Sequence, residues 1–199
     1  MCAVDARLAG LIARIGPHRP LITHSPFNAL VGAILQQQVS MKAAAAMERK
    51  LRAQCPSGRI SSPAIAALRL PQLRKAGLSR QKCAYVSDLA ARFVRRELNA
   101  AMLRRMNDDE VIEATTRVKG IGRWTAEMLL IFCLERPDVW PIDDLGLRKA
   151  VRQFLGLSDF ADKQTITQLA EPWRPYRSYA TWYLWRSLEG PFMPGKAVT

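Results

Sequence analysis

Clustered cysteine and histidine residues are missing from this sequence. Its four cysteines, Cys2, Cys55, Cys83 and Cys133, lie far apart, and its two histidines form no ligand group with them. Zinc and iron–sulfur sites need closely spaced ligands, so we expect no iron–sulfur cluster and no required cofactor. Because no secretory signal is evident and the apolar residues suffice for a large core, we also expect no disulfide framework. The expected compartment is the cytoplasm, on the nucleoid if the source is bacterial.

Long apolar runs and strand-like alternation are scarce as well. No segment approaches the roughly 20 apolar residues that cross a bilayer. We find no alternation of apolar and polar residues, no internal repeat and no low-complexity linker. These absences argue against a membrane partner and a β-rich fold. We expect an all-α protein whose 199 residues form a single compact unit with two lobes and a cleft, and only the tail after Leu188 loose.

Positive charge is what the sequence has in excess. It contains 30 Lys and Arg residues against 17 Asp and Glu residues, which gives a formal net charge of +13 and a pI near 10.3. Such an excess favours polyanionic partners through phosphate contacts and counterion release. Nucleic acid is therefore the leading partner, although a basic surface without a partner remains an alternative on charge alone.

Helical spacing of apolar residues recurs along the chain. One helix should begin with Ser25 as N-cap and Pro26 at its first position, and Ser62–Pro63 repeats this signal. Another should begin at Asn107, with Glu110 completing a capping box. The apolar stripes that predict buried faces are Phe27, Leu30, Val31, Ile34 and Leu35, and then Val86, Leu89, Ala90, Phe93 and Val94.

The sharpest local feature is a glycine-bracketed turn, Gly120-Ile121-Gly122, between two helical stretches at about residues 107–135. Glycine allows positive φ and close backbone approach, and Ile121 can fill the gap between the helices. Amides at the start of the second helix then point outward and can bind a phosphate, with Lys119 and Arg123 adding charge. A G-x-G pattern by itself is weak evidence for DNA binding and is more often an ordinary helix-turn-helix corner.

About 20 residues after this turn, Asp143-Asp144 opens another helix at about residues 143–155. A hairpin followed by such an aspartate resembles the helix-hairpin-helix (HhH-GPD) DNA glycosylases. The resemblance is closest to the AlkA-type 3-methyladenine glycosylases, in a short form that lacks their N-terminal domain. It implies a two-lobed helical fold with the hairpin beside a central cleft. The segments that carry it are Ala33–Ser40, Ala76–Lys82, the block from the hairpin to Asp144, and Trp173–Ala180 with Trp185.

The two adjacent aspartates point in different directions on a helix, so they are poorly placed to act as an acid/base pair. We expect Asp143 to be the N-cap and Asp144 to lie in the first turn; that both merely cap the helix is the alternative. The resemblance assigns the catalytic role to Asp144, which would stabilise positive charge on the deoxyribose or position the attacking water. Purines alkylated at N3 or N7 are good leaving groups, so one carboxylate suffices.

The resemblance also implies a base pocket. Trp124 stands where bifunctional relatives carry a Schiff-base lysine, which predicts a glycosylase without lyase activity. Trp185 aligns with the family's stacking tryptophan, and Met128 replaces a pocket tyrosine. A flipped, electron-poor base would stack on these indoles. A core role for Trp124 is the alternative.

A wedge must fill the stack that the flipped base leaves. The resemblance places it in the turn Gln36–Ser40 and favours Gln38. Whether Gln37 or Gln38 is the wedge remains open, and a polar helix end is the alternative. Relatives also suggest a monovalent ion on the backbone carbonyls of Thr116, Val118 and Ile121. The residues expected to contact DNA are Gly120, Gly122, Lys119, Arg123, Thr125, Gln37, Gln38 and Ser40.

Three functions remain compatible with the sequence. The first is a monomeric, monofunctional glycosylase that flips alkylated purines (3-methyladenine, 7-methylguanine) out of damaged duplex DNA and hydrolyses their N-glycosidic bonds, which starts base excision repair. The second is a related glycosylase for another base, such as hypoxanthine, etheno-adenine or a mismatched base. The third is a catalytically silent DNA-binding module. The block from the hairpin to Asp144 favours the first.

Overall fold

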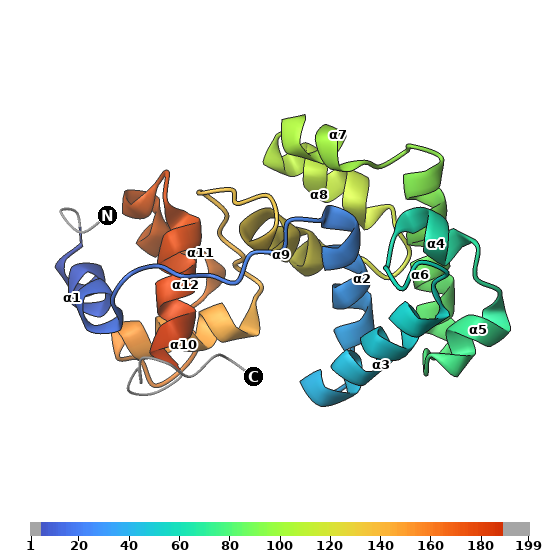
Figure 1. Cartoon of the computed structure of the whole chain (residues 1–199). Helices are drawn as coiled ribbons and strands as arrows, with labels where there is room; N and C mark the ends of the chain where they lie inside the picture. The colour runs from blue at the N-terminus through green and yellow to red at the C-terminus, as the bar shows by residue number, and fades with distance from the viewer. Residues whose placement is uncertain (1–4, 189–199) are drawn as a thin grey trace. The chain divides into compact units, whose positions relative to one another are not determined.

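The computed structural model describes residues 5–188, and within this range all regular structure is helical (Figure 1). Helices α1 to α12 and one 3-10 helix account for it, so the prediction of an all-α fold is confirmed. The expected loose tail after Leu188 lies outside the described residues, as does Cys2. Among the described helices, none has both the length and the apolar character that a membrane span requires.

The chain forms two compact units. One consists of Met1–Leu21 with Glu135–Thr199, and the other of Ile22–Leu134. We call them the terminal unit and the central unit. The predicted hairpin lies in the central unit, and the predicted catalytic aspartate lies in the terminal unit.

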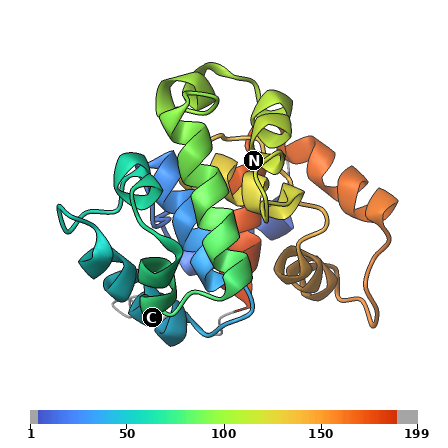
Figure 2. The same ribbon diagram turned by 90° about the vertical axis from the view of Figure 1, so that its right-hand side faces the viewer.

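The central unit is built around α6, which packs against α2 and α4. Figure 2 shows α6, in green, running alongside the blue α2. Helix α2 also contacts α3 and α9, and α8 packs against α9. The helices of this unit are α2 (Pro26–Gln36), α3 (Met41–Gln54), α4 (Ser62–Ala66), α5 (Leu70–Lys75), α6 (Arg80–Val94), α7 (Ala100–Arg105), α8 (Asp108–Thr116) and α9 (Arg123–Phe132).

Two helices of this unit begin with the predicted N-caps. The Ser25 hydroxyl accepts from the Asn28 amide at the start of α2, and Asn107 with Glu110 forms the predicted capping box of α8. The second Ser-Pro signal was misplaced by one residue, because Ser61 and not Ser62 is the N-cap of α4. In a Ser-Ser-Pro run both serines can cap, and only the backbone conformation decides between them.

The predicted apolar stripes form the core of the central unit. Leu30, Ile34 and Leu35 on α2 and Val86 and Leu89 on α6 are almost fully buried. One member of the α6 stripe is wrong, since Val94 is 50% exposed. It is the last residue of its helix, where the chain turns away from the core. The thiols of Cys55, Cys83 and Cys133 are reduced and buried, and burial raises the pKa of Cys55 and Cys83.

In the terminal unit, α12 packs against α1 and α10. Its core includes Trp173, which is fully buried and whose indole Nε1 donates to Asp5 Oδ2 at 3.2 Å. Asp5 is also the N-cap of α1, so this contact joins the start of the described chain to the 3-10 helix before α12. The elements are α1 (Ala6–Ile15), α10 (Leu145–Leu155), α11 (Lys163–Ala170), the 3-10 helix η1 (Glu171–Trp173) and α12 (Arg177–Ser187).

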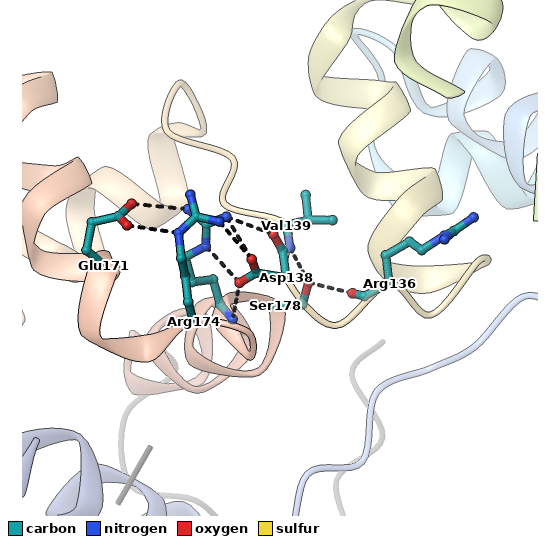
Figure 3. Close-up of polar contacts among 7 residues, drawn as sticks. Arg136, Asp138, Val139, Glu171, Arg174 and Ser178 are labelled. Carbon is teal, nitrogen blue, oxygen red and sulfur yellow. Dashed lines mark hydrogen bonds and ion pairs between the residues drawn. The ribbon is translucent and has the colours of Figure 1, made fainter. Parts of the chain in front are cut away.

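An ion-pair network holds the segment that leads toward α10 (Figure 3). Asp138 accepts from Arg177 Nε at 2.8 Å and from Arg174 Nη1 at 3.0 Å, and Glu171 pairs with Arg174. Burial alone would raise the pKa of Asp138, but the hydrogen bonds from Arg177 and the charges of Arg177 and Arg174 together hold that pKa below its usual value. The Trp173–Ala180 segment therefore anchors the chain on the way to Asp144.

Ser178 adds a second anchor at the same place. Its hydroxyl donates to the Arg136 carbonyl at 2.6 Å and accepts from the Val139 amide at 2.8 Å. Its own amide donates to the Pro137 carbonyl. Figure 3 shows Ser178 between the two chain positions that it joins. These bonds satisfy the backbone of a segment outside any helix.

We predict that Asp138→Asn lowers stability by about 2 kcal/mol at neutral pH, because hydrogen bonds to charged groups contribute about 1.5–3 kcal/mol. The pKa of Asp138 is lower in the folded state, so its contribution is complete above the unfolded value of about 4 and is lost as pH falls through the folded value. Urea denaturation between pH 7 and about pH 2 measures this. The difference in the free energy of unfolding between wild type and Asp138→Asn should become smaller as the pH falls. Asp159→Asn, at an exposed position, serves as the control.

Candidate active site

The predicted catalytic aspartate caps a helix. Asp144 is the N-cap of α10, and its Oδ1 accepts from the Leu147 amide at 2.5 Å. The assignment of the cap to Asp143 was wrong: that residue precedes the helix, is exposed, and pairs with Lys163 at 2.6 Å. Both residues are good caps by type, and the extended backbone at position 144 decides between them.

A second donor reaches the same carboxylate oxygen. The indole Nε1 of Trp185, on α12, donates to Asp144 Oδ1 at 2.8 Å. A Cβ added at Gly146 would lie 3.1 Å from Asp144 Oδ1 and 3.3 Å from the Trp185 ring, so the glycine leaves room for this contact. A carboxylate fixed by two donors can face a developing positive charge with little reorganisation.

The hydrogen bond of Trp185 has no signal in the sequence. The resemblance implied only that its ring stacks on a base, and the two partners are 41 residues apart. Its aromatic neighbours on α12 differ, because Trp182 and Tyr183 are buried whereas Trp185 is partly exposed.

The hairpin turn lies between α8 and α9, within the predicted range. Val118 and Ile121 are buried, and the Ile121 amide donates to the Val118 carbonyl at 3.1 Å. Gly120 has φ of +81°, and a Cβ there would lie 2.1 Å from the Tyr85 ring. Gly122 differs, with φ of −98° and open space around its Cα, so of the two bracketing glycines only Gly120 uses the positive φ that glycine allows. Gly122 is the N-cap of α9 and supplies no side-chain cap to that helix.

The two basic residues of the hairpin have different surroundings. Lys119 is exposed, and its amide donates to Asp88 Oδ2 at 2.9 Å. Arg123 is 63% exposed and pairs with the buried Glu127 at 3.1 Å. Lys119 is thus the less neutralised of the two charges beside the amides of α9.

A cavity of about 1180 Å³ opens beside the hairpin within the central unit. It is lined by Trp124, Thr125 and Met128 from α9 and by the glutamine turn after α2. Trp124 is 51% exposed, so the core alternative for this residue is wrong, whereas Thr125 is only 8% exposed. The structure thus brings two of the three predicted pocket residues, Trp124 and Met128, to one cavity.

The two wedge candidates in the glutamine turn have different surroundings. Gln37 donates from Nε2 to the Gly120 carbonyl at 2.8 Å and is partly buried. Gln38 is exposed and has φ of +56°, a strained conformation for a residue other than glycine. Ser40 is the N-cap of α3, where its hydroxyl accepts from the Ala43 amide at 3.2 Å.

The expected ion site consists of backbone carbonyls. Hard cations bind oxygen ligands, so these carbonyls have suitable chemistry. The Val118 carbonyl, however, already accepts the hairpin hydrogen bond from the Ile121 amide. The exposed Thr116 directs its hydroxyl to the Ile112 carbonyl at 2.8 Å. Across residues 5–188, no cluster of three or more His, Cys, Asp or Glu residues could hold a metal ion.

Three residues on α6 were missed as parts of this arrangement. Lys82 contacts the last turn of α2, and Tyr85 and Asp88 contact the hairpin. Only Lys82 lies in a segment that carried the family resemblance. Each is separated from its partner by more than 30 residues, so no local pattern could reveal the contacts.

Comparison with known proteins identifies similar chains. A family model described as HhH-GPD superfamily base excision DNA repair protein matches residues 31–175. DNA-3-methyladenine glycosylase 1 of Schizosaccharomyces pombe is 33% identical over 183 residues, which cover 91% of this chain and 80% of that protein.

Two solved structures share the fold. A 3-methyladenine DNA glycosylase of the same yeast, in complex with abasic DNA, matches with a TM-score of 0.78 and 31% identity, covering 94% of this chain and 93% of that chain. A DNA-3-methyladenine glycosidase of Bacillus halodurans matches with a TM-score of 0.86 and 31% identity, covering 94% and 86%.

The two hairpin glycines should respond differently to alanine. Gly120→Ala should destabilise the protein by about 1–3 kcal/mol, because the methyl group meets Tyr85 and the backbone has positive φ. Gly122→Ala, the matched control, has open space and should lose less than about 1 kcal/mol, mainly through poorer N-capping. Urea denaturation compares them, and equal losses would contradict the packing of Tyr85 on Gly120.

Proposed function

This chain belongs to the HhH-GPD superfamily of base excision DNA repair proteins, and we propose that it is a monofunctional DNA-3-methyladenine glycosylase. Its substrates are purines alkylated at N3 or N7, such as 3-methyladenine and 7-methylguanine, in damaged double-stranded DNA, on which it acts as a monomer. The observation that carries this proposal is the carboxylate of Asp144, held through Oδ1 by Leu147 and Trp185. The names of the similar proteins support the substrate class.

The reaction is hydrolysis of the N-glycosidic bond of a flipped nucleotide. As the bond breaks, positive charge develops on the deoxyribose, and the Asp144 carboxylate stabilises it. The electron pair of the bond neutralises the cationic base, so that base leaves without a general acid. Water adds to the sugar carbon and loses a proton, which leaves an abasic site.

Binding and extrusion of the base belong to the central unit. The amides at the start of α9, beside Lys119 and Arg123, hold a backbone phosphate, and the net charge of +13 supplies the general attraction. Gln38 fills the vacated stack, since Gln37 is engaged with the hairpin. A monovalent ion on the carbonyls around Val118 would strengthen the phosphate grip.

The DNA strand stays intact in this reaction. Strand cleavage by bifunctional glycosylases needs an amine that forms a Schiff base with the sugar. In this chain Trp124 occupies that position and lines the cavity with its ring half exposed. An exposed indole offers a stacking surface for an electron-poor base and no nucleophile.

Asp144→Asn should abolish base release while DNA binding persists. The amide keeps the shape of the side chain and an acceptor oxygen for the cap, but it lacks the negative charge that stabilises the transition state. Asp143→Asn is the matched control, because its partner is the exposed Lys163. Single-turnover release of 7-methylguanine from methylated duplex DNA measures the effect, and the expected loss for Asp144→Asn is at least about a thousandfold.

The same assay separates the alternatives. Near-wild-type release by folded Asp144→Asn would refute the catalytic assignment. Wild-type activity confined to neutral bases such as hypoxanthine would refute the alkylpurine class, and binding without release from any substrate would indicate a silent DNA-binding module. The product should be cut only after alkali treatment.

Two substitutions of Trp185 distinguish the role of its hydrogen bond to Asp144 from the role of its aromatic face. Trp185→Phe keeps a ring but removes the donor to Asp144, so release of 7-methylguanine and of hypoxanthine should fall alike, by about tenfold or more. Trp185→Ala also removes the aromatic face, and the further loss should be larger for cationic 7-methylguanine because a cation–π contribution disappears. Wild-type rates for Trp185→Phe would show that the hydrogen bond is dispensable. Equal further losses for both bases would argue against selection by charge.

A further inference from the structure

One face of α6 contacts both the end of α2, which leads into the glutamine turn, and the hairpin. Lys82, Tyr85 and Asp88 are spaced by three residues and so lie on the same side of the helix. Lys82 contacts the end of α2, Tyr85 packs on Gly120, and Asp88 binds the backbone beside it. We call these three residues the α6 brace.

Lys82 holds the end of α2. Its ammonium donates to the Leu35 carbonyl at 2.6 Å, and the side chain is buried, which lowers the pKa of Lys82. The last carbonyls of a helix lack partners within it, and a cation there also complements the helix dipole. Burial of an ammonium is costly, so a role in packing alone would be served better by an apolar side chain. The Lys82 ammonium therefore lies at the carbonyl of Leu35, two residues before Gln37.

Asp88 and Tyr85 hold the hairpin. Asp88 Oδ2 accepts from the Lys119 amide at 2.9 Å and from Arg92 Nε at 3.2 Å. Although burial would raise the pKa of Asp88, these hydrogen bonds keep it below its usual value. The Tyr85 ring occupies the space where a side chain at Gly120 would lie. Two consecutive hairpin residues are therefore fixed from α6.

Gln37 closes the arrangement by joining the two turns directly. Its Nε2 donates to the Gly120 carbonyl across 83 residues of sequence. The next residue, Gln38, is strained and exposed, and a strained conformation persists only where its surroundings hold it. Immediately before Gln38, the chain is held at two points: Lys82 binds the Leu35 carbonyl, and Gln37 binds the Gly120 carbonyl.

We propose that Lys82, Tyr85, Asp88 and Gln37 are positioning residues that hold the turn carrying Gln38 in register with the hairpin amides. Phosphate binding by the hairpin then sets the point at which Gln38 enters the DNA. Small displacements of positioned groups can reduce rates by about a hundredfold, so loss of the brace should impair base extrusion more than DNA affinity. This inference rests on the proposed function.

Two variants remove the two bonds on either side of the α2 C-terminus, that of Lys82 to Leu35 and that of Gln37 to Gly120. Lys82→Met keeps a long side chain in an apolar site, and Gln37→Leu keeps the size of a partly exposed residue. Lys75→Met is the matched control, because it removes one positive charge from an exposed position at the end of α5. Circular dichroism melting confirms that each variant is folded.

The first measurement does not depend on release of a base. The probe is a duplex with a tetrahydrofuran abasic site opposite 2-aminopurine, whose fluorescence reports insertion of a side chain, while anisotropy gives the Kd. Lys82→Met and Gln37→Leu should bind within about threefold of wild type but lose most of the fluorescence change. Lys75→Met should keep the full change. Wild-type fluorescence changes in both brace variants would overturn the proposal.

The second measurement is single-turnover release of 7-methylguanine, either paired with cytosine or opposite an abasic site, where extrusion is easier. The brace variants should lose about tenfold or more on the paired base and less than about threefold on the unpaired base. Equal losses would indicate a general structural defect and overturn the proposal. If wild type releases no base from either duplex, the proposed function fails, and the fluorescence measurement still decides whether the brace positions Gln38.

Discussion

The hydrogen bonds at Asp144 Oδ1 set the requirements for the rest of the terminal unit. One donor comes from the start of α10 and the other from Trp185 on α12, so the two helices must be held in register. The buried Trp173 and the bonds of Ser178 to the segment before α10 fulfil that requirement. A carboxylate oriented in this way favours charge stabilisation over proton transfer as its chemical role.

The central unit solves a different problem, which is to display backbone amides and an exposed side chain at defined places. Gly120 has positive φ and Gln38 is strained, and strained conformations persist only where their surroundings hold them. Helix α6, 15 residues long with a nearly fully buried core face, contacts the hairpin and bonds to Leu35 just before the glutamine turn. Loops that carry function on a rigid scaffold are common, and here the scaffold contributes specific polar contacts as well as apolar packing.

Local chemistry made much of the fold predictable. The caps Ser25 and Asn107 and the apolar stripe of α2 depend on neighbours within one or two turns, so their patterns survive in the sequence. The errors arose where two adjacent residues suit one position equally well, as with Asp143 and Asp144. In such a pair the backbone conformation decides, and that conformation depends on packing of the whole segment.

The sequence by itself determined the helical class, the hairpin and the expected partner, because spacing, charge and residue type suffice for these. The candidate residues Asp144, Trp124 and Trp185 came from the resemblance of its motifs to a known family. Tertiary structure alone decided that Trp185 donates to Asp144, that Gln37 binds the hairpin while Gln38 is exposed, and that Lys82 caps α2. These contacts join residues 41, 83 and 47 positions apart. Hydrogen bonds depend on distance and direction in space, and residue spacing carries neither for partners so far apart along the chain.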